Sequence, residues 1–393
     1  MLAEALTITL WNPAKKFAKS AIRQASQAAF KLQVRSFQSH ASTRCNGSPK
    51  RILILNPAHI GDVVISTSII PVLRSAYPRA ELGFAVGSWS LMVVKAHPDV
   101  SFTHIVDHWM YNRSKEGFFA KLRTYRKTRG IALCDIRRAK YDIALSLTPF
   151  WGDLLKLAWK AGIPNRLGFC GSPYAPFATN LTKYPDTPFM QMGARQLEVL
   201  RPLSVDEFHL KKRKSVLAES NDDARKELCE LLRVERLQDI TYRIIHMGAG
   251  ALNKEAPLDF WRKIAEEVSL KRTLVFTGKG KREGEQIERV TAGLSNCINA
   301  CDQISWQGFV AAVRGCELLY GVDSMAGHVA AAVGTRCAVV YSGIDGVARW
   351  RPEGDKCLVF TNHLLCAPCG NIRGCKDMTC IREVRPEDLV NLG

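Results

Sequence analysis

The chain has 393 residues, too long for one ordinary core, and this length predicts two domains. Its hydrophobic content of 47% and charged content of 23% are typical of a globular protein. No uncharged apolar run is long enough to predict a membrane-spanning helix. The formal net charge of +18 predicts an anionic partner such as a nucleic acid, an acidic lipid or a phosphorylated substrate.

Residues 1–50 form a basic arm in which eight Lys and Arg residues face one acid, Glu4. From Asn12-Pro13 onward, apolar residues recur at helical spacing with Lys and Gln opposite. This pattern predicts a basic amphipathic helix on an anionic membrane surface. A solvated tail and an organelle transit peptide fit the same composition, whereas a secretory signal does not, because the arm has no continuous apolar core.

The next segment, residues 51–206, is predicted to be the first α/β domain. Short apolar runs alternate with amphipathic stretches, which is typical of a parallel sheet covered by helices on both faces. Helices are predicted at 63–76, kinked at Pro71, and at 154–161. Residues 111–140 form an insertion with ten Lys and Arg residues. The predicted strands are 52–55, 81–86, 103–106, 141–147 and 166–169.

Residues 207–240 are predicted to be the linker, with a run of basic residues at 211–214 followed by a polar helix. A second α/β series then fills 241–393. Its predicted strands are 242–247, 273–277, 317–322 and 336–342. Its predicted helices are 258–270, 283–294, 306–315 and 326–333.

Two segments, 56–62 and 321–328, join a short apolar strand to a helix through a glycine-containing turn. Such a turn gathers backbone N–H groups and the positive end of a helix dipole at one point, which suits a diphosphate. One such turn in each half predicts two α/β lobes that face each other across a ligand cleft. Neither turn is a dinucleotide or P-loop fingerprint, since Gly248-Ala249-Gly250 lacks the third glycine and no P-loop pattern occurs.

Seven separated blocks carry a family resemblance. The first half has RILILNPAHIGDVVISTSIIPVLR from Arg51, YDIALSL from Tyr141 and NRLGF from Asn165. The second half has HMGAG with Lys254, Thr277-Gly278 with Glu283, Asp323-Ser324 with Gly327-His328, and Trp350-Arg351-Pro352. In this order they resemble the ADP-heptose:lipopolysaccharide heptosyltransferases, from Arg51 to the C-terminus.

The resemblance implies a GT-B architecture of two facing Rossmann-like domains with parallel sheets and an interdomain cleft. The second domain is expected to bind most of the nucleotide sugar and the first domain the acceptor. The resemblance also implies inversion at the anomeric carbon, with no cofactor required for catalysis. Residues 1–50 lie outside it.

The resemblance assigns catalytic roles to two residues. Asp62 matches the family's base on the acceptor hydroxyl, although an Asp before a helix is also a common N-cap. Lys254 is expected to stabilise the departing diphosphate as a point charge, whereas composition alone favours a surface lysine beside Glu255. His59 and Gly61 are predicted on the acceptor side, and the alternative for His59 is an exposed loop histidine.

The donor is predicted to meet backbone N–H groups at a helix start, with Gly327 allowing the phosphates a close approach. Asp323 either contacts donor hydroxyls or caps this helix, and His328 makes either a phosphate contact or a structural hydrogen bond. Glu283 accepts hydrogen bonds from the ribose, unless Glu285 takes that place. The predicted donor-binding residues are Gly248, Gly250, Gly278, Glu283, Asp323, Ser324, Met325, Ala326, Gly327 and His328.

Four of the 13 cysteines lie within 15 residues of one another near the C-terminus: Cys366, Cys369, Cys375 and Cys380. Four thiolates can close a tetrahedral structural site for zinc or iron, and similar cysteine-rich ends occur in the family. Disulfides fit less well, because the other cysteines are scattered singly as in a reducing compartment.

The predicted function is heptosyl transfer from an ADP-linked donor to an acidic, lipopolysaccharide-core-like acceptor. The chain is expected in the cytoplasm, in peripheral contact with the anionic cytoplasmic face of the inner membrane. Alternatives are the same fold with another nucleotide sugar or a protein acceptor, and an inactive nucleotide-sugar-binding scaffold. No nucleic-acid partner is expected, because the basic stretches lack interleaved aromatic residues.

Overall fold

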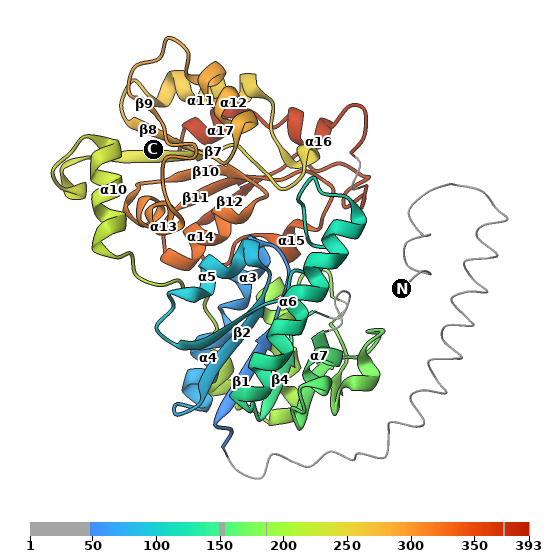
Figure 1. Cartoon of the computed structure of the whole chain (residues 1–393). Coiled ribbons are helices and arrows are strands. Elements are labelled where there is room, and N and C mark those ends of the chain that lie inside the picture. The colour runs from blue at the N-terminus through green and yellow to red at the C-terminus, as the bar shows by residue number, and fades with distance from the viewer. Residues whose placement is uncertain (1–47, 149–153, 186, 372–373, 393) are drawn as a thin grey trace.

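The computed structural model describes residues 48–148, 154–185, 187–371 and 374–392, so the predicted N-terminal helix lies outside the described residues. The described chain forms two lobes, each built on a six-stranded sheet whose paired strands are parallel (Figure 1). The first sheet has the order β3-β2-β1-β4-β5-β6 and the second the order β12-β11-β10-β7-β8-β9. Each order is that of a Rossmann fold. In this fold the first three strands extend the sheet to one side of the first strand, and the next three extend it to the other side.

The first strands of the sheets are buried on both faces, as expected for parallel strands covered by helices. Their bounds follow in chain order. The N-terminal lobe has β1 (Arg51–Leu55), β2 (Glu81–Val86), β3 (Val100–Ile105), β4 (Ile143–Ser146), β5 (Asn165–Phe169) and β6 (Asn180–Thr182). The C-terminal lobe has β7 (Tyr242–His246), β8 (Thr273–Thr277), β9 (Cys297–Asn299), β10 (Leu319–Val322), β11 (Cys337–Val340) and β12 (Cys357–Phe360).

Helices cover both sheets, and their apolar faces supply the two cores. Those before the crossing between lobes are α3 (Ile60–Ser66), α4 (Ile69–Ala76), α5 (Leu91–Lys95), α6 (Phe118–Ala139), α7 (Leu154–Lys160), α8 (Met192–Leu197) and α9 (Glu207–Leu210). Those after it are α10 (Asp222–Leu232), α11 (Leu258–Val268), α12 (Lys281–Thr291), α13 (Trp306–Gly315), α14 (Met325–Val333), α15 (Val347–Trp350), α16 (Thr379–Arg382) and α17 (Pro386–Val390).

The predicted helix at 63–76 is two helices, and the predicted kink at Pro71 is wrong. The break lies at Thr67 and Ser68, where the Thr67 hydroxyl donates to Val64 and accepts the N–H of Val216 at 2.9 Å. Pro71 lies in the first turn of α4, where its missing N–H removes no helical hydrogen bond. The side chain of Thr67 therefore both ends α3 and fixes the chain that leaves the first lobe.

The basic insertion is mostly the 22-residue helix α6, which the sequence pattern did not predict. Its buried side chains Tyr125, Ala132, Ile136 and Ala139 pack in the core of the N-terminal lobe, and most of its basic residues face solvent. In the part of the chain that the structure describes, no helix combines the length and apolar character needed to cross a bilayer.

The predicted linker at 207–240 divides between the lobes. Helix α9 belongs to the first lobe, where His209 Nδ1 lies 2.7 Å from Ser75 Oγ. Helix α10 packs on α13 of the second lobe, and Glu227 accepts the N–H of Ser305 at 2.7 Å. The connection between the two lobes is therefore the short stretch between these helices.

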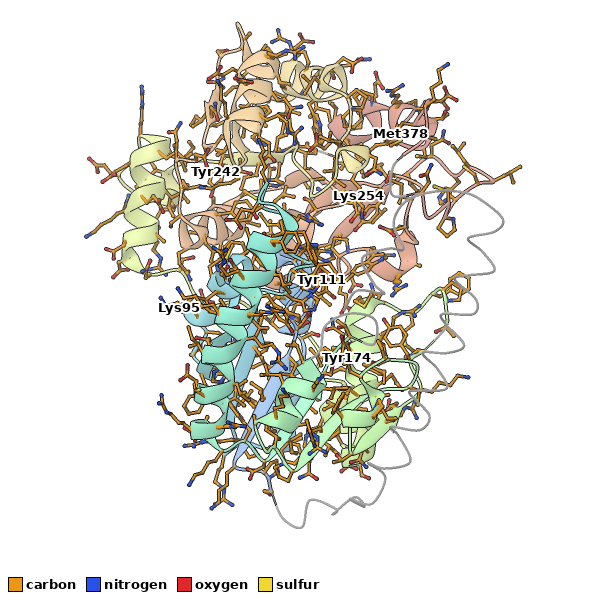
Figure 2. The ribbon with its side chains drawn as sticks, turned by 45° about the vertical axis from the view of Figure 1, so that its right-hand side comes forward. Lys95, Tyr111, Tyr174, Tyr242, Lys254 and Met378 are labelled. Carbon is orange, nitrogen blue, oxygen red and sulfur yellow. The ribbon has the colours of Figure 1, made fainter. Side chains whose placement is uncertain are left out.

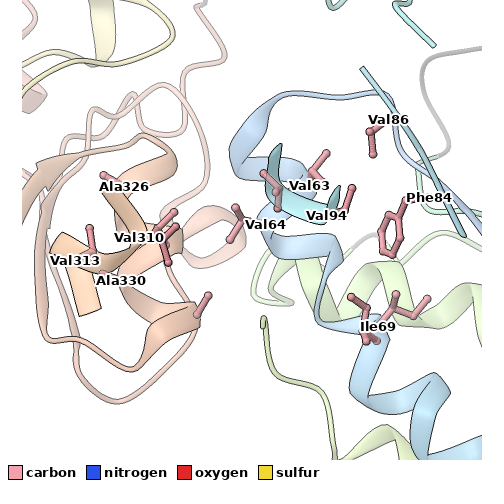
Figure 3. Close-up of a cluster of buried hydrophobic side chains, with 14 of the residues drawn as sticks. Val63, Val64, Ile69, Phe84, Val86, Val94, Val310, Val313, Ala326 and Ala330 are labelled. Carbon is pink, nitrogen blue, oxygen red and sulfur yellow. The ribbon is translucent and has the colours of Figure 1, made fainter. Parts of the chain in front are cut away.

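The lobes meet along α3 and α14, whose apolar residues belong to one continuous cluster. Figure 3 shows Val63 and Val64 of α3 on one side of this contact and Val310 and Ala326 on the other. The helices approach closely at Gly61, where a Cβ atom would lie 3.4 Å from His328 Cδ2. Because both helices begin at this contact, their N-terminal ends lie together between the lobes.

Candidate active site between the lobes

A cavity of about 750 Å³ lies between the lobes at the ends of β1, β7 and β10. These strands flank the points where the order of each sheet reverses, the usual place for a ligand in an open α/β sheet. Tyr111 and Lys254, labelled in Figure 2 near the junction of the lobes, both line it. The structure thus brings residues from both halves of the sequence to one site.

Asp62 lies on the wall that the N-terminal lobe contributes. It is the third residue of α3, and its Oδ2 atom accepts the N–H of His59, the N-cap residue, at 3.2 Å. The carboxylate therefore stabilises the start of the helix while it also lines the cavity. Asp62 is thus not the predicted N-cap, which is His59, but the third residue of the helix, and its role as a base stays a prediction.

The turn before α3 is held by buried polar contacts. Asn56 is fully buried, donates to Ser66 Oγ at 2.6 Å and accepts the N–H of Ala58 at 3.2 Å. Trp89 donates its indole N–H to the carbonyl of Ala58 at 2.8 Å. These bonds fix the position of Asp62 relative to the end of β1.

The electrostatic surroundings of Asp62 favour a proton acceptor that works near neutral pH. Burial raises its pKa from the ordinary value of 3.8 to about 6, against the opposing effects of the His59 hydrogen bond and then the charges of Arg113 and Lys254. The neighbouring imidazole of His59 is uncharged at neutral pH, because burial and then Arg113 lower its pKa to about 4. A base with a pKa near 6 is mostly ionised at pH 7 and still accepts a proton readily.

Lys254 is not the surface lysine beside Glu255 that composition favoured. Its ammonium group donates to Asp323 Oδ2 and to Asp345 Oδ2, each at 2.7 Å, and only 23% of its side chain is exposed. Glu255 pairs instead with Arg282. Sequence reasoning missed Asp345, although it follows the end of β11, where ligand-binding residues gather in such sheets.

Asp323 does not cap α14. Its carboxylate accepts from Lys254, and the N-cap position belongs to Ser324. The Ser324 hydroxyl is buried without a hydrogen-bond partner among the described residues, and the residue lines the cavity beside Met325. An unpartnered hydroxyl at a helix N-terminus, where the first N–H groups are also free, suits an anion.

Two predicted donor-binding residues of α14 face away from the cavity. Ala326 is fully buried in the contact between the lobes. A Cβ atom at Gly327 would lie 2.9 Å from Pro352 Cγ and 3.0 Å from Val339 Cγ2. The missing side chain of Gly327 therefore permits packing inside the lobe, not the predicted close approach of a phosphate.

Glu283, rather than Glu285, is the carboxylate at the cavity. Its Oε2 atom accepts the N–H of Lys279 at 2.9 Å, and burial raises its pKa. Side chains at Gly248 and Gly278 would overlap the Glu283 carboxyl group, so both glycines make room for it. Glu285 is exposed and pairs with Lys281 at 3.6 Å.

His246 and His328 supply uncharged rings at neutral pH, because burial lowers the pKa of each to about 4. His246 Nδ1 lies 3.0 Å from Thr277 Oγ1, and His328 lies against Gly61 at the contact between the lobes. Any contact of His328 with a phosphate would thus be a neutral hydrogen bond. Gly61 lies at this same contact while also lining the cavity.

The segment before α6 brings residues to the cavity that sequence reasoning placed only in a basic insertion. Tyr111 packs edge-on against His59, with ring centroids 5.7 Å apart. Arg113 crosses to the other lobe and lies over Gly250. Trp350 also lines the cavity and lay in a block that matched the family, but no role was predicted for it. No sequence pattern indicated that Arg113 and Tyr111 line the cavity, because their positions there depend on how the two lobes meet.

The four C-terminal cysteines do not gather into a metal site in the part of the chain that the structure describes. Cys366, Cys369 and Cys375 are exposed, while Cys380 is buried and packs toward Gly343. This arrangement does not present four thiolates to one ion. The predicted zinc or iron stays a prediction, which metal analysis of the purified full chain tests.

The chain is similar to several heptosyltransferases. Lipopolysaccharide heptosyltransferase 3 of Escherichia coli (strain K12) is 20% identical over 310 residues, which are 76% of this chain and 84% of the relative. The solved structure of E. coli ADP-heptose lps heptosyltransferase II has a TM-score of 0.67 at 17% identity, covering 86% of this chain and 96% of its own. E. coli heptosyltransferase WaaC with ADP has a TM-score of 0.59 at 15% identity, covering 79% and 92%.

The two structures confirm the expected GT-B fold. The sequence model of the family described as "Glycosyltransferase family 9 (heptosyltransferase)" matches residues 133–377, more than half of the chain and most of the lobe that holds Lys254 and Asp323. The chain therefore belongs to glycosyltransferase family 9, the heptosyltransferase family.

Proposed function

We propose that this glycosyltransferase moves a heptose, or a related sugar, from an ADP-linked donor to an acidic acceptor like the lipopolysaccharide core, with inversion at the anomeric carbon. The names of the relatives support the sugar, since one solved structure is an ADP-heptose heptosyltransferase and another holds ADP. The site supports the chemistry, since its two walls come from different lobes.

The observation that carries the proposal is the carboxylate of Asp62, which lines the same cavity as the N-terminus of α14. Inversion in one step needs a base on one side of the sugar and stabilisation of the leaving group on the other. Asp62 has a pKa of about 6 and suits the first task. The start of α14, where the Ser324 hydroxyl has no partner among the described residues, suits the second.

In the proposed step, a hydroxyl oxygen of the acceptor attacks the anomeric carbon of the donor sugar as its proton passes to Asp62. The new bond between carbon and oxygen forms on the face opposite the diphosphate, and the bond to the diphosphate oxygen breaks. ADP leaves with the electron pair of that bond. Protonated Asp62 then returns its proton to solvent, which its pKa allows at neutral pH.

Lys254 has a more constrained role than a free point charge. Its two carboxylate partners, Asp323 and Asp345, together outweigh its charge. We assign the lysine to holding these carboxylates at the end of β10 and β11, where they can accept hydrogen bonds from donor hydroxyls. Its ammonium group contributes to leaving-group stabilisation only where the donor replaces one of these carboxylates.

We further propose that the chain binds the anionic cytoplasmic face of the inner membrane through α6. This helix carries seven Lys and Arg residues and one acid, Asp135. Arg123, Arg126, Lys127 and Arg138 are exposed along it, and of these only Arg138 pairs with a carboxylate among the described residues. Thr124 of the same helix lines the cavity, so the basic face leads toward the site where an acidic glycolipid would enter.

The test of this function is a transfer assay with a panel of nucleotide sugars, including ADP-heptose, other ADP-sugars and UDP- and GDP-sugars, and with lipopolysaccharide-core and protein acceptors. The proposal predicts turnover with an ADP-linked sugar and a core acceptor, lost in Asp62→Asn. Turnover only with a UDP- or GDP-sugar would show that the ADP-linked donor is wrong. Turnover only with a protein acceptor would show that the core acceptor is wrong. Binding of a donor without transfer to any acceptor would favour an inactive scaffold.

A further inference from the structure

Among the described residues, Arg113 is the one Lys or Arg of the N-terminal lobe that lines the cavity, and it lies beside the loop of Gly250 in the C-terminal lobe. We propose that Arg113 binds the diphosphate of the nucleotide donor and so couples donor binding to the contact between the lobes. This inference rests on the proposed function, because it takes the donor to be a nucleoside diphosphate sugar.

The position of Arg113 is set by the absence of a side chain on the facing loop. A Cβ atom at Gly250 would lie 2.8 Å from Arg113 Cζ and 3.0 Å from Nη2, so the guanidinium lies directly over this glycine. Figure 1 shows the start of α6 and the segment before it beside the C-terminal lobe. Gly250 follows β7, at the point of the sheet where the nucleotide binds in such folds.

The other cationic side chains that line the cavity are already paired with carboxylates. Lys254 donates to two carboxylates, and Lys279 pairs with Asp302 at 2.8 Å. The lining histidines are uncharged at neutral pH. Among the described residues, the Arg113 guanidinium has neither a hydrogen bond nor a carboxylate within ion-pair distance.

The Arg113 side chain is exposed and has the charge of Asp62 nearby but not in direct contact, so its guanidinium is free to bind an anion that enters the cavity. Its planar fork matches two oxygens of a phosphate group, which a lysine cannot do. Since Arg113 reaches the loop of Gly250 from the opposite lobe, a diphosphate held by it would contact both lobes at once. A phosphate on the acceptor has the same chemistry, so the test measures binding without acceptor.

The experiment measures the affinity of the full chain for ADP, UDP, GDP, pyrophosphate and adenosine by calorimetry, without acceptor. The variants are Arg113→Ala, Arg113→Lys and Gly250→Ala, whose methyl group would displace the guanidinium. The matched control is Lys115→Ala, an exposed cation two positions away that does not line the cavity. Circular dichroism and thermal unfolding establish that each variant is folded.

Loss of charge-assisted hydrogen bonds to Arg113 predicts about 10- to 100-fold weaker binding of ADP and pyrophosphate in Arg113→Ala. Gly250→Ala should show the same selective loss and Arg113→Lys a partial one, with adenosine and the control unchanged. Equal ADP and pyrophosphate affinity in the wild type and a folded Arg113→Ala would overturn the inference. The same holds if ADP and adenosine weaken together.

The outcome also separates this inference from the proposed function. If pyrophosphate, UDP or GDP binds through Arg113 and ADP binds no more tightly than UDP or GDP, the role of Arg113 is supported and the ADP-linked donor is wrong. If ADP binds tightly and its affinity is the same in Arg113→Ala, the ADP-linked donor is supported and the role of Arg113 is wrong. If the wild type binds no nucleoside diphosphate and no pyrophosphate, both are wrong.

Discussion

The substitution Asp62→Asn separates the two roles of this residue. The asparagine Oδ1 atom can still accept the N–H of His59, so the start of α3 is preserved. The amide cannot take a proton from the acceptor, so we expect kcat to fall about 100- to 10,000-fold, the usual contribution of a general base. ADP binding should change little, because the residue lies on the acceptor-side lobe.

The stability of this variant depends on the pKa of Asp62, which is raised from 3.8 to about 6 in the folded chain. Between these values the folded state binds the proton more tightly than the unfolded state, so this group's contribution to stability falls as the pH rises. One pH unit corresponds to about 1.4 kcal/mol, which gives an upper limit of about 3 kcal/mol, reduced to about 1 kcal/mol by partial exposure. Asp62→Asn removes this cost and should be at least as stable as the wild type at pH 8.

The assay is turnover from pH 5 to 8 together with thermal unfolding at pH 4 and 8. Wild-type turnover should fall about tenfold per pH unit below pH 6, where Asp62 becomes protonated. The matched control is Asp222→Asn, an acidic first-turn residue of α10 that lies outside the cavity. Near-normal turnover in a folded Asp62→Asn would refute the base, and a strongly destabilised Asp62→Asn at pH 8 would refute the electrostatic argument.

Three further predictions follow from the site and its surroundings. Glu283→Gln should weaken ADP and adenosine binding about 5- to 20-fold in titration calorimetry, because a carboxylate acceptor of ribose hydrogen bonds is lost. The control Glu285→Gln, at an exposed residue, should leave both affinities unchanged, and equal effects of the two substitutions would contradict the role of Glu283. Gly327→Ala should lower the free energy of unfolding, measured by chemical denaturation, by about 1–3 kcal/mol through overpacking. ADP affinity should not change, and a selective loss of ADP binding would show that Gly327 does lie against the phosphates. Charge reversal of Arg126 and Lys127 to Glu should weaken the affinity for phosphatidylglycerol vesicles, measured by cosedimentation, about 30-fold or more, at about 1 kcal/mol per basic residue. Binding to phosphatidylcholine vesicles should not change. Unchanged binding to phosphatidylglycerol vesicles would show that α6 does not contact the membrane.

Most of the sheet strands could be predicted, because each central strand is a short apolar run between turn residues. The strands β6, β9 and β12 were missed, since they have only three or four residues at the edges of the sheets. The helix α6 was missed because its charges hide the apolar positions that pack on the lobe. Local sequence carries little signal for elements that tertiary packing stabilises.

Within the site, the sequence motifs located the turns but not the pairing of their side chains. Asp62, Lys254 and Asp323 lie in blocks that follow central strands, and topology brings such strand ends together. The partnership of Lys254 with Asp345 and the position of Arg113 over Gly250 depend on contacts between distant segments. No spacing rule in a single sequence encodes such contacts.

The most direct test of the central claim is the anomeric configuration of the transferred sugar, measured by nuclear magnetic resonance on the product of a single turnover. One carboxylate, Asp62, activating the acceptor opposite the departing diphosphate predicts a product with the configuration opposite to that of the donor. A product that retains the donor's configuration would contradict single displacement and the role of Asp62 as its base.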